Sequence, residues 1–287
     1  MTGIIVVDKP EGWTSFDVAA KLRGVFHERR VGHGGTLDPM ATGVLPIFLG
    51  RATRALPYFE EFGDKEYAAG LRLGLETDTE DTTGETLVTR PVEASYEQVK
   101  AAIEALRGPQ MQVPPMYSAI RVNGQRLYDL ARQGKTVERK ARPVTIHEAE
   151  LLSGEGEEYL FRVRCSKGTY VRTLCAEVGQ SLGCGGCMSS LRRTAAGCYT
   201  IEQAVTMEQI LAAEDPTALL LSLDTLFSAY PAVTISGAAE RKLRNGNPIP
   251  GDGPEGRCRV YGENGEFLAL GRFEQGQIIT VKSFFEV

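Results

Sequence analysis

The stretch that decides the fold of this chain reads GHGGTLDPMATGVLP and runs from Gly32 to Pro46. Glycines and threonines crowd a single carboxylate, Asp38, and glycine lets a backbone approach a ligand closely. Pro39 disfavours helical geometry at Asp38 and so displays its side chain. An aspartate in a loop of this composition is also a common turn former. Taken alone, the loop is therefore either a turn or a catalytic site.

The elements predicted around this loop do not follow a regular βαβα alternation. Thr14 with Asp17, and Ser95 with Gln98, match the capping-box pattern that begins a helix, and Gly108 is expected to end the second helix. Residues 109–143 read as irregular and basic. Hydrophobic patterning predicts strands over residues 4–7, 67–75 and 158–166. It also predicts a helix over residues 170–182. This order favours an α+β fold over a doubly wound sheet.

The character of the chain changes near residue 230. Three short segments beyond it, 257–262, 266–273 and 277–285, read as strands, and Asn264-Gly265 is a strong hairpin turn. We therefore expect two domains, a catalytic body over residues 1–229 and a small β-rich domain over residues 230–287.

Length and composition fit an ordinary globular protein that buries its own core. The chain has 287 residues, of which 42% are hydrophobic and 24% charged. No apolar run approaches the roughly 18 residues that cross a bilayer, and the N-terminus lacks the features of a signal peptide. The expected location is the cytoplasm.

The net charge of −5 hides a strong segregation of charge along the chain. Residues 60–104 carry 12 acidic and 4 basic side chains, whereas residues 121–143 carry 7 basic and 2 acidic ones. Residues 21–30 hold 4 basic side chains and 1 acidic one. Such blocks can form a basic face for nucleic acid on an acidic protein. Two solvated surfaces without a partner are an equal alternative.

The motifs of common cofactor sites are missing. The sequence has no P-loop, no GxGxxG after the first strand, no HExxH and no GxSxG, and Asp78–Gly84 resembles a calcium loop only loosely. Cys184 and Cys187 form one CxxC, but zinc needs four ligands and the chain has three histidines. We expect reduced thiols in a glycine-rich turn, and no metal or other cofactor.

Two further clusters carry polar chemistry. Ser166–Leu174 lies at a strand-to-helix junction, where Arg172 could clamp a buried carboxylate and Tyr170 could pack beneath a planar ligand. A solvated arginine at a helix N-terminus is the alternative. Leu191–Thr194 contains two adjacent arginines and, alone, reads as a basic turn.

Together, these stretches resemble the bacterial TruB type of tRNA pseudouridine synthase. The resemblance covers residues 4 to about 200, with one visible departure, Gly34, where the family often has threonine. The matching blocks occur in the family's order: Asp8–Ser15, Gly32–Pro46, Lys65–Tyr67, Gly74–Gly84, Pro114–Ala119, Ser166–Leu174 and Leu191–Thr194.

The resemblance implies a pseudouridine-synthase fold, with a mixed, mainly antiparallel sheet flanked by helices and loops, and a PUA-like RNA-binding domain at the C-terminus. It implies that the enzyme isomerises uridine 55 in the T-arm loop of tRNA, without a cofactor or an obligate protein partner. Asp38 would be the nucleophile, acting on C6 of the base, on C1′ of the ribose, or through a glycal. Arg172 would pair with Asp38 and stabilise its charge.

The same resemblance assigns substrate contacts, because the target base must leave its stack. Tyr67 would stack on the flipped uracil, near the proton lost from C5, and His33 would contact the distorted loop. Residues 115–143 would form a basic insertion that closes on the T-loop. The remaining assignments are Tyr170 and Leu191 to the pocket lining, Lys9 to the pocket floor, and Arg139, Lys140 and Arg142 to the RNA backbone.

Three other functions remain open at this point. The first is a guide-dependent synthase that works in a ribonucleoprotein. The second is an RNA chaperone that remodels tRNA without chemistry. The third is a hydrolase that uses Asp38 and His33, although no second carboxylate or base has a motif-like spacing.

Overall fold

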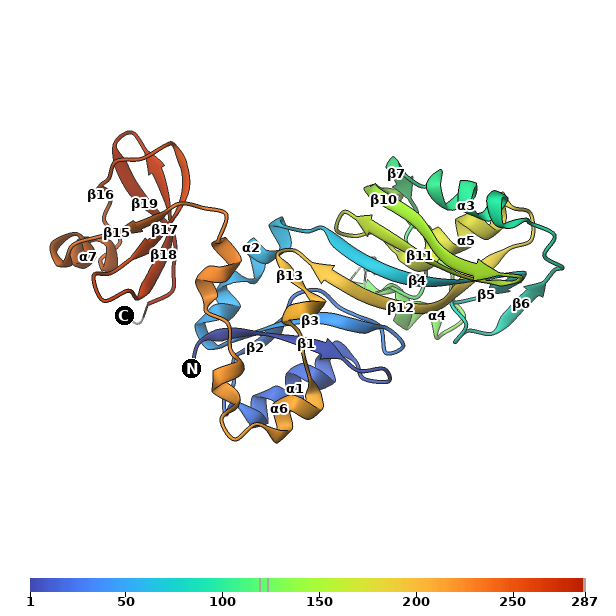
Figure 1. The fold of residues 1–287 in the computed structure, drawn as a ribbon, viewed down its shortest axis with the longest axis horizontal. Helices are drawn as coiled ribbons and strands as arrows, with labels where there is room; N and C mark the ends of the chain where they lie inside the picture. Colours follow the sequence, from blue (N-terminus) through green and yellow to red (C-terminus); the bar gives the residue numbers. More distant parts are fainter. Residues whose placement is uncertain (119, 123, 286–287) are drawn as a thin grey trace.

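A computed structural model describes residues 1–118, 120–122 and 124–285. Ala119 of the Pro114–Ala119 block, and the last two residues of the expected C-terminal domain, lie outside the described residues. Figure 1 shows a large body built on one curved sheet and a smaller β-rich body that holds the C-terminal part of the chain.

Within the described residues, the larger sheet holds ten strands and is mainly antiparallel, as predicted. Among the described strands of this sheet, the β1–β14 and β3–β12 pairs are parallel and the other pairs are antiparallel. Strands β2 (Val31–His33) and β13 (Tyr199–Thr200) attach to β3 and β12. The other strands lie in the order β14 (Val205–Thr206), β1 (Gly3–Lys9), β3 (Thr42–Leu49), β12 (Gly186–Ala196), β4 (Lys65–Leu73), β11 (Glu158–Cys165), β10 (Arg142–Glu155) and β7 (Gly108–Gln112).

Helices cover this sheet at both of its ends. In Figure 1, α3 (Tyr96–Glu104) and α5 (Val171–Ser181) lie beside the β7–β4 half, whereas α1 (Ser15–Val25) and α6 (Met207–Ala212) lie near β1 and β3. The short α2 (Leu56–Glu61) follows a 3-10 turn, η1 (Gly50–Ala55), and a two-stranded ribbon joins β5 (Leu75–Thr77) to β6 (Thr86–Thr89).

The predicted helix starts are confirmed by their caps. The Thr14 side chain accepts from the Asp17 N–H and Ser95 accepts from Gln98, so both capping boxes form. The predicted end of the second helix at Gly108 is wrong, because α3 already ends at Glu104. Gly108 instead begins β7, with a φ of 115° that favours glycine.

The prediction that residues 109–143 are irregular is only partly right. Strand β7 pairs with the start of β10, and the segment between them contains β8 (Arg121–Val122), β9 (Gln125–Arg126) and α4 (Leu127–Ala131). Strand β7 escaped detection because it is an edge strand that exposes Met111 and carries Pro109. The alternative that residues 191–194 form a basic turn is excluded, since these residues lie inside β12, near the middle of the sheet.

The C-terminal β-rich domain is confirmed. Its sheet follows the order β15 (Ala232–Thr234), β17 (Gly256–Tyr261), β18 (Phe267–Glu274), β19 (Gln277–Ser283) and β16 (Ile249–Pro250), and α7 (Gly237–Arg244) packs on it. Gly265 turns the β17–β18 hairpin at a φ of 79°. The domain meets the larger body through aromatic rings: the ring of Phe227 packs at a tilt against those of Phe267 and Phe284.

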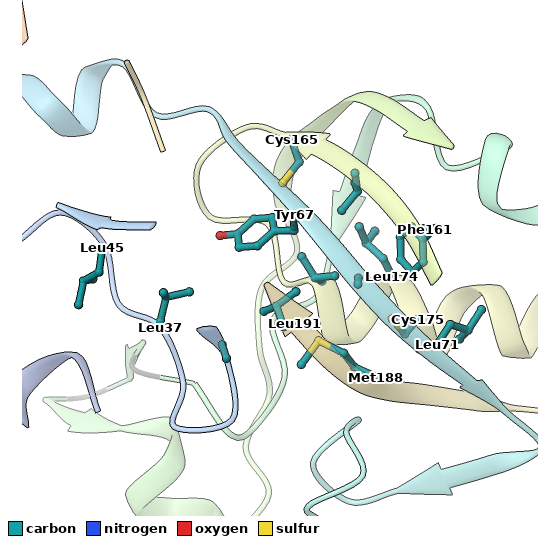
Figure 2. Packing of buried hydrophobic residues seen from close by; sticks show 14 of the residues in the cluster. Leu37, Leu45, Tyr67, Leu71, Phe161, Cys165, Leu174, Cys175, Met188 and Leu191 are labelled. Carbon is teal, nitrogen blue, oxygen red and sulfur yellow. The ribbon is translucent and has the colours of Figure 1, made fainter. Parts of the chain in front are cut away.

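The main core lies between the sheet and α5. Phe161, Leu71, Leu174 and Cys175 are fully buried there (Figure 2). Figure 2 also shows that the hydroxyl of Tyr67 points away from this cluster, toward the loop that carries Leu37. The sheet thus presents a polar group to the Gly32–Pro46 stretch. Among the described residues, no helix is both long and apolar enough to cross a membrane.

Candidate active site

Asp38 lies in a loop whose backbone is held on both sides of it. The Leu37 N–H donates to Ser15 Oγ at 2.8 Å, and the Pro39 carbonyl accepts from the Gly12 N–H at 2.8 Å. Ser15 and Gly12 belong to the Asp8–Ser15 block, so the first block fixes the second. A carboxylate on such a held loop is preorganised for chemistry.

Lys9 completes this support from below the loop. It is fully buried, and its ammonium donates to the carbonyls of Pro10, Trp13 and Pro39 at 2.8, 2.6 and 3.3 Å. Burial lowers the pKa of Lys9 to about 8, although Asp38 acts in the opposite direction. An ammonium has three donors, and all three are used here. In the structure Lys9 supports the loop, which accepts its hydrogen bonds, and its assignment to substrate stays a prediction.

Arg193 braces the same loop from β12. Its side chain is fully buried, and it donates from Nε to the Val44 carbonyl at 2.7 Å and from Nη2 to the Gly35 carbonyl at 3.2 Å. The backbones of β3 and β12 approach so closely that a Cβ on Gly43 would lie 2.2 Å from the Arg193 carbonyl oxygen. This close approach explains why position 43 of the Gly32–Pro46 stretch is a glycine.

Arg172 joins two carboxylates at the first turn of α5. Its Nη2 lies 2.5 Å from Asp38 Oδ2, and its Nη1 lies 3.4 Å from Asp81 Oδ2. The Arg172 side chain is 9% exposed, whereas that of Asp38 is 42% exposed. The expected Arg172–Asp38 pair is present, and Asp38 keeps an open side that a substrate can reach.

Asp81 is a site residue that sequence reasoning missed. Its side chain is 5% exposed, and its Oδ1 accepts from the Thr79 and Thr83 hydroxyls at 2.8 and 2.5 Å. The Gly74–Gly84 block is one of those that resemble the family. A carboxylate among threonines, however, does not indicate that its partner is an arginine about 90 positions later in the chain. The block resembles a calcium loop only loosely, and the Asp81 oxygens already accept hydrogen bonds from threonines and contact Arg172, so they are not available to calcium.

Tyr67 is a buried aromatic residue next to this network. It projects from β4 opposite Arg193 of β12, and burial raises its pKa to about 12, against the opposing effect of the Arg193 charge. Leu191 of β12 lies beside it (Figure 2) and is almost fully buried. The ring and the leucine together form an apolar, aromatic side of the site.

His33 and Tyr170 border the site from two other elements. His33 ends β2, and burial, together with the Arg193 charge, lowers its pKa. Tyr170 is the N-cap residue of α5, two positions before Arg172, and burial raises the pKa of its phenol. Both side chains are half-buried.

The neighbours of Gly34 in the structure explain why this position is a glycine. A Cβ at this position would lie 2.5 Å from the ring of Phe59, which packs against Phe48 and Tyr199. The aromatic ring occupies the space that a larger residue at position 34 would need.

The cations of the basic insertion that were expected to contact RNA differ in their exposure to solvent. Lys140 and Arg142 are exposed, as RNA contacts require. Arg139 is half-buried and donates from Nη1 to the Pro114 carbonyl at 3.1 Å. The Tyr117 hydroxyl donates to Asp78 Oδ2 at 3.0 Å and ties the insertion to the Gly74–Gly84 block. Arg139 therefore supports the insertion from within, and the RNA contacts assigned to Arg139, Lys140 and Arg142 stay predictions.

Within the described residues, no three His, Cys, Asp or Glu side chains gather in a way that could hold a metal ion. Cys184 and Cys187 are both buried free thiols, and Cys187 lies in β12. The side chains at the site supply an accessible carboxylate, a guanidinium in contact with it, and apolar and aromatic groups beside them.

Comparisons with known protein families match nearly the whole chain. The TruB family pseudouridylate synthase N-terminal domain matches residues 23–171. The tRNA pseudouridylate synthase B C-terminal domain matches residues 172–228. The C-terminal domain of pseudouridine synthase II TruB matches residues 231–282.

Individual relatives agree with these families. The chain is 41% identical over 289 aligned positions to tRNA pseudouridine synthase B of Escherichia coli K12, covering 96% of this chain and 92% of the relative, and equally identical to that of Shigella flexneri serotype 5b. Among solved structures, an H/ACA RNP bound to a substrate RNA containing 2′-deoxyuridine has a TM-score of 0.72 at 24% identity, covering 99% of this chain and 85% of that chain. A Cbf5-Nop10-Gar1 complex has the same TM-score at 25% identity, with the same coverage.

Proposed function

Because the chain belongs to the TruB family of tRNA pseudouridine synthases, we propose that its target is uridine 55 in the T-arm loop and that Asp38 is the nucleophile. The enzyme isomerises uridine to pseudouridine in tRNA. The bond from C1′ to N1 breaks, a bond from C1′ to C5 forms, C5 loses its proton and N1 gains one. The reaction is redox-neutral and imports no group.

The observation that carries this proposal is the placement of Asp38. Its loop is held at Leu37 and Pro39, its carboxylate contacts Arg172 at 2.5 Å, and one side remains accessible. A guanidinium in contact stabilises negative charge on a carboxylate, and a charged carboxylate is the nucleophilic form. Three routes fit this geometry: addition to C6 of the base, attack on C1′, and removal of the C2′ proton to give a glycal.

The site would receive a base that has left its stack. The flipped uracil would lie against Tyr67 and Leu191, with Tyr170 at the border, and this placement sets the Tyr67 hydroxyl near C5. His33 would contact the distorted loop, where the extruded bases leave a gap. Lys9 and Arg193 would not touch the base but would hold the Asp38 loop.

The RNA backbone would lie across exposed cations outside the pocket. Lys140 and Arg142 would contact phosphates at the T-arm, and residues 230–287, as a PUA-like domain, would contact another part of the tRNA. The proposed enzyme needs no protein partner and no cofactor, and it works in the cytoplasm, where its tRNA substrate is.

The test is conversion of a bare tRNA transcript by the purified chain alone. We expect one pseudouridine per transcript, mapped by reverse transcription to the T-loop. Conversion only after a guide RNA is added would favour the guide-dependent alternative. Tight tRNA binding without conversion would favour a chaperone without chemistry.

A further inference from the structure

Gln112 is a buried polar residue that none of the roles above uses. It ends β7, is 2% exposed, and directs its side-chain amide at the backbone of Tyr170. The Tyr170 N–H donates to Gln112 Oε1 at 2.8 Å, and Gln112 Nε2 donates to the Tyr170 carbonyl at 3.2 Å. One side chain thus pairs with both polar groups of a single backbone residue, as a neighbouring strand would.

On one side, Gln112 stands at the base of the insertion. It pairs across the sheet with Arg142, and this is the outermost pair of the β7–β10 ladder. The basic segment leaves the sheet directly after Gln112 and returns to it at Arg142. The two residues are therefore the points at which the insertion is attached to the rigid body.

On the other side, Gln112 holds the start of α5. Tyr170 is the N-cap residue of α5, and its own side chain makes no capping hydrogen bond. The Tyr170 carbonyl also accepts from the Leu174 N–H at 3.3 Å, the first bond of the helix. The orientation of this peptide determines the direction of the first turn, and that turn carries Arg172 toward Asp38.

We propose that Gln112 is a positioning residue that couples the base of the RNA-contacting insertion to the Arg172–Asp38 pair. When the insertion settles on RNA, its attachment point and the first turn of α5 are held in one arrangement by the two amide hydrogen bonds. The inference rests on the proposed roles of Asp38 and Arg172, and it adds that RNA contact and catalytic geometry are mechanically linked through one side chain.

The test compares Gln112→Met with a matched control, Gln110→Met. Methionine keeps the length and volume of glutamine but forms neither hydrogen bond. Gln110 lies on the same face of β7, and its amide nitrogen has no hydrogen-bond partner within the described part of the chain. We expect Gln112→Met to lower the single-turnover rate on saturating tRNA by about tenfold or more, since two hydrogen bonds are lost. The dissociation constant for tRNA should stay within about threefold, and Gln110→Met should resemble wild type.

Several outcomes would overturn the inference. A Gln112→Met rate within twofold of wild type would remove the coupling, and so would an equal loss of rate in Gln110→Met. A loss confined to tRNA affinity would reduce Gln112 to a support of the insertion. If Gln112→Met fails to fold, Gln112→Asn, which keeps both polar atoms on a shorter chain, is measured in its place and should show the same loss of rate. Absence of conversion by wild type would instead refute the proposed function.

Discussion

Arg172 and Asp38 lie 134 positions apart in the sequence, and their side chains meet at 2.5 Å. The same guanidinium reaches Asp81 at 3.4 Å, so one buried cation lies between an accessible carboxylate and a buried one. The buried carboxylate is fixed by threonines, which makes it the anchor of the arrangement. The position of the accessible carboxylate thus depends on a network that reaches the Gly74–Gly84 block.

Replacing Arg172 by lysine should cost far more than conservation of charge suggests. A lysine cannot reach two carboxylates with a planar fork, so Arg172→Lys should lower turnover by about 10- to 100-fold, the range of one or two lost charged hydrogen bonds. Arg192→Lys is the matched control, because Arg192 forms a bidentate pair with Asp8 that is partly exposed. A near-normal rate for Arg172→Lys would refute the clamp.

Neutralising Asp81 should affect both stability and turnover. Asp81→Asn leaves Arg172 with a single carboxylate partner in a buried setting, and breaking a buried pair costs roughly 3 kcal/mol. We expect a lower urea midpoint and at least a tenfold loss of rate in the folded protein, with tRNA affinity nearly unchanged. Unchanged turnover per folded molecule would confine Asp81 to a role in stability.

Removing two exposed cations of the insertion should weaken RNA binding and its dependence on salt. Each phosphate contact contributes a salt slope of about 0.7 to 0.9, so Lys140→Gln with Arg142→Gln should flatten the slope by about 1 to 2. Arg139→Gln should change the slope much less, because its guanidinium bonds to Pro114 inside the insertion. Filter binding across a salt series measures the affinity and its salt slope. Equal slopes in wild type, the double variant and Arg139→Gln would indicate that the RNA binds elsewhere on the protein.

The buried phenol of Tyr67 predicts a loss of stability in alkali. Its pKa is about 12 in the folded protein, against 10.0 ordinarily. Between these values the unfolded chain has lost the proton and the folded chain keeps it, so stability falls as pH rises through this window. Two pKa units correspond to about 3 kcal/mol. Urea unfolding of Tyr67→Phe should show a shallower decline above pH 10 than wild type, and parallel curves would contradict the burial.

Local features of the fold could be predicted from the sequence because they depend on neighbours in the chain. The capping boxes at Thr14 and Ser95, the alternating strand that became β11, and the Asn264-Gly265 hairpin all follow from short patterns. The Arg172–Asp38 pair came from the resemblance to a family and not from spacing, since the fold brings the two residues together.

What escaped prediction depends on contacts between distant segments. Arg193 read as part of a basic turn, but it is buried in β12 and holds the Asp38 loop by its carbonyls. The resemblance assigns Lys9 to the pocket floor and Arg139 to the RNA backbone, but it does not indicate that backbone carbonyls of the protein itself accept hydrogen bonds from both side chains. Gln112 has no charge and no motif of its own that indicates a partner 58 residues away.

The most direct test of the account is tritium release from unmodified tRNA that carries 5-³H-uridine, with wild type and Asp38→Ala measured side by side. Wild type should release about one equivalent per tRNA, and Asp38→Ala should release none while its tRNA affinity stays within about tenfold of wild type. Release by Asp38→Ala, or a loss of affinity as large as the loss of turnover, would contradict the role of Asp38 as nucleophile.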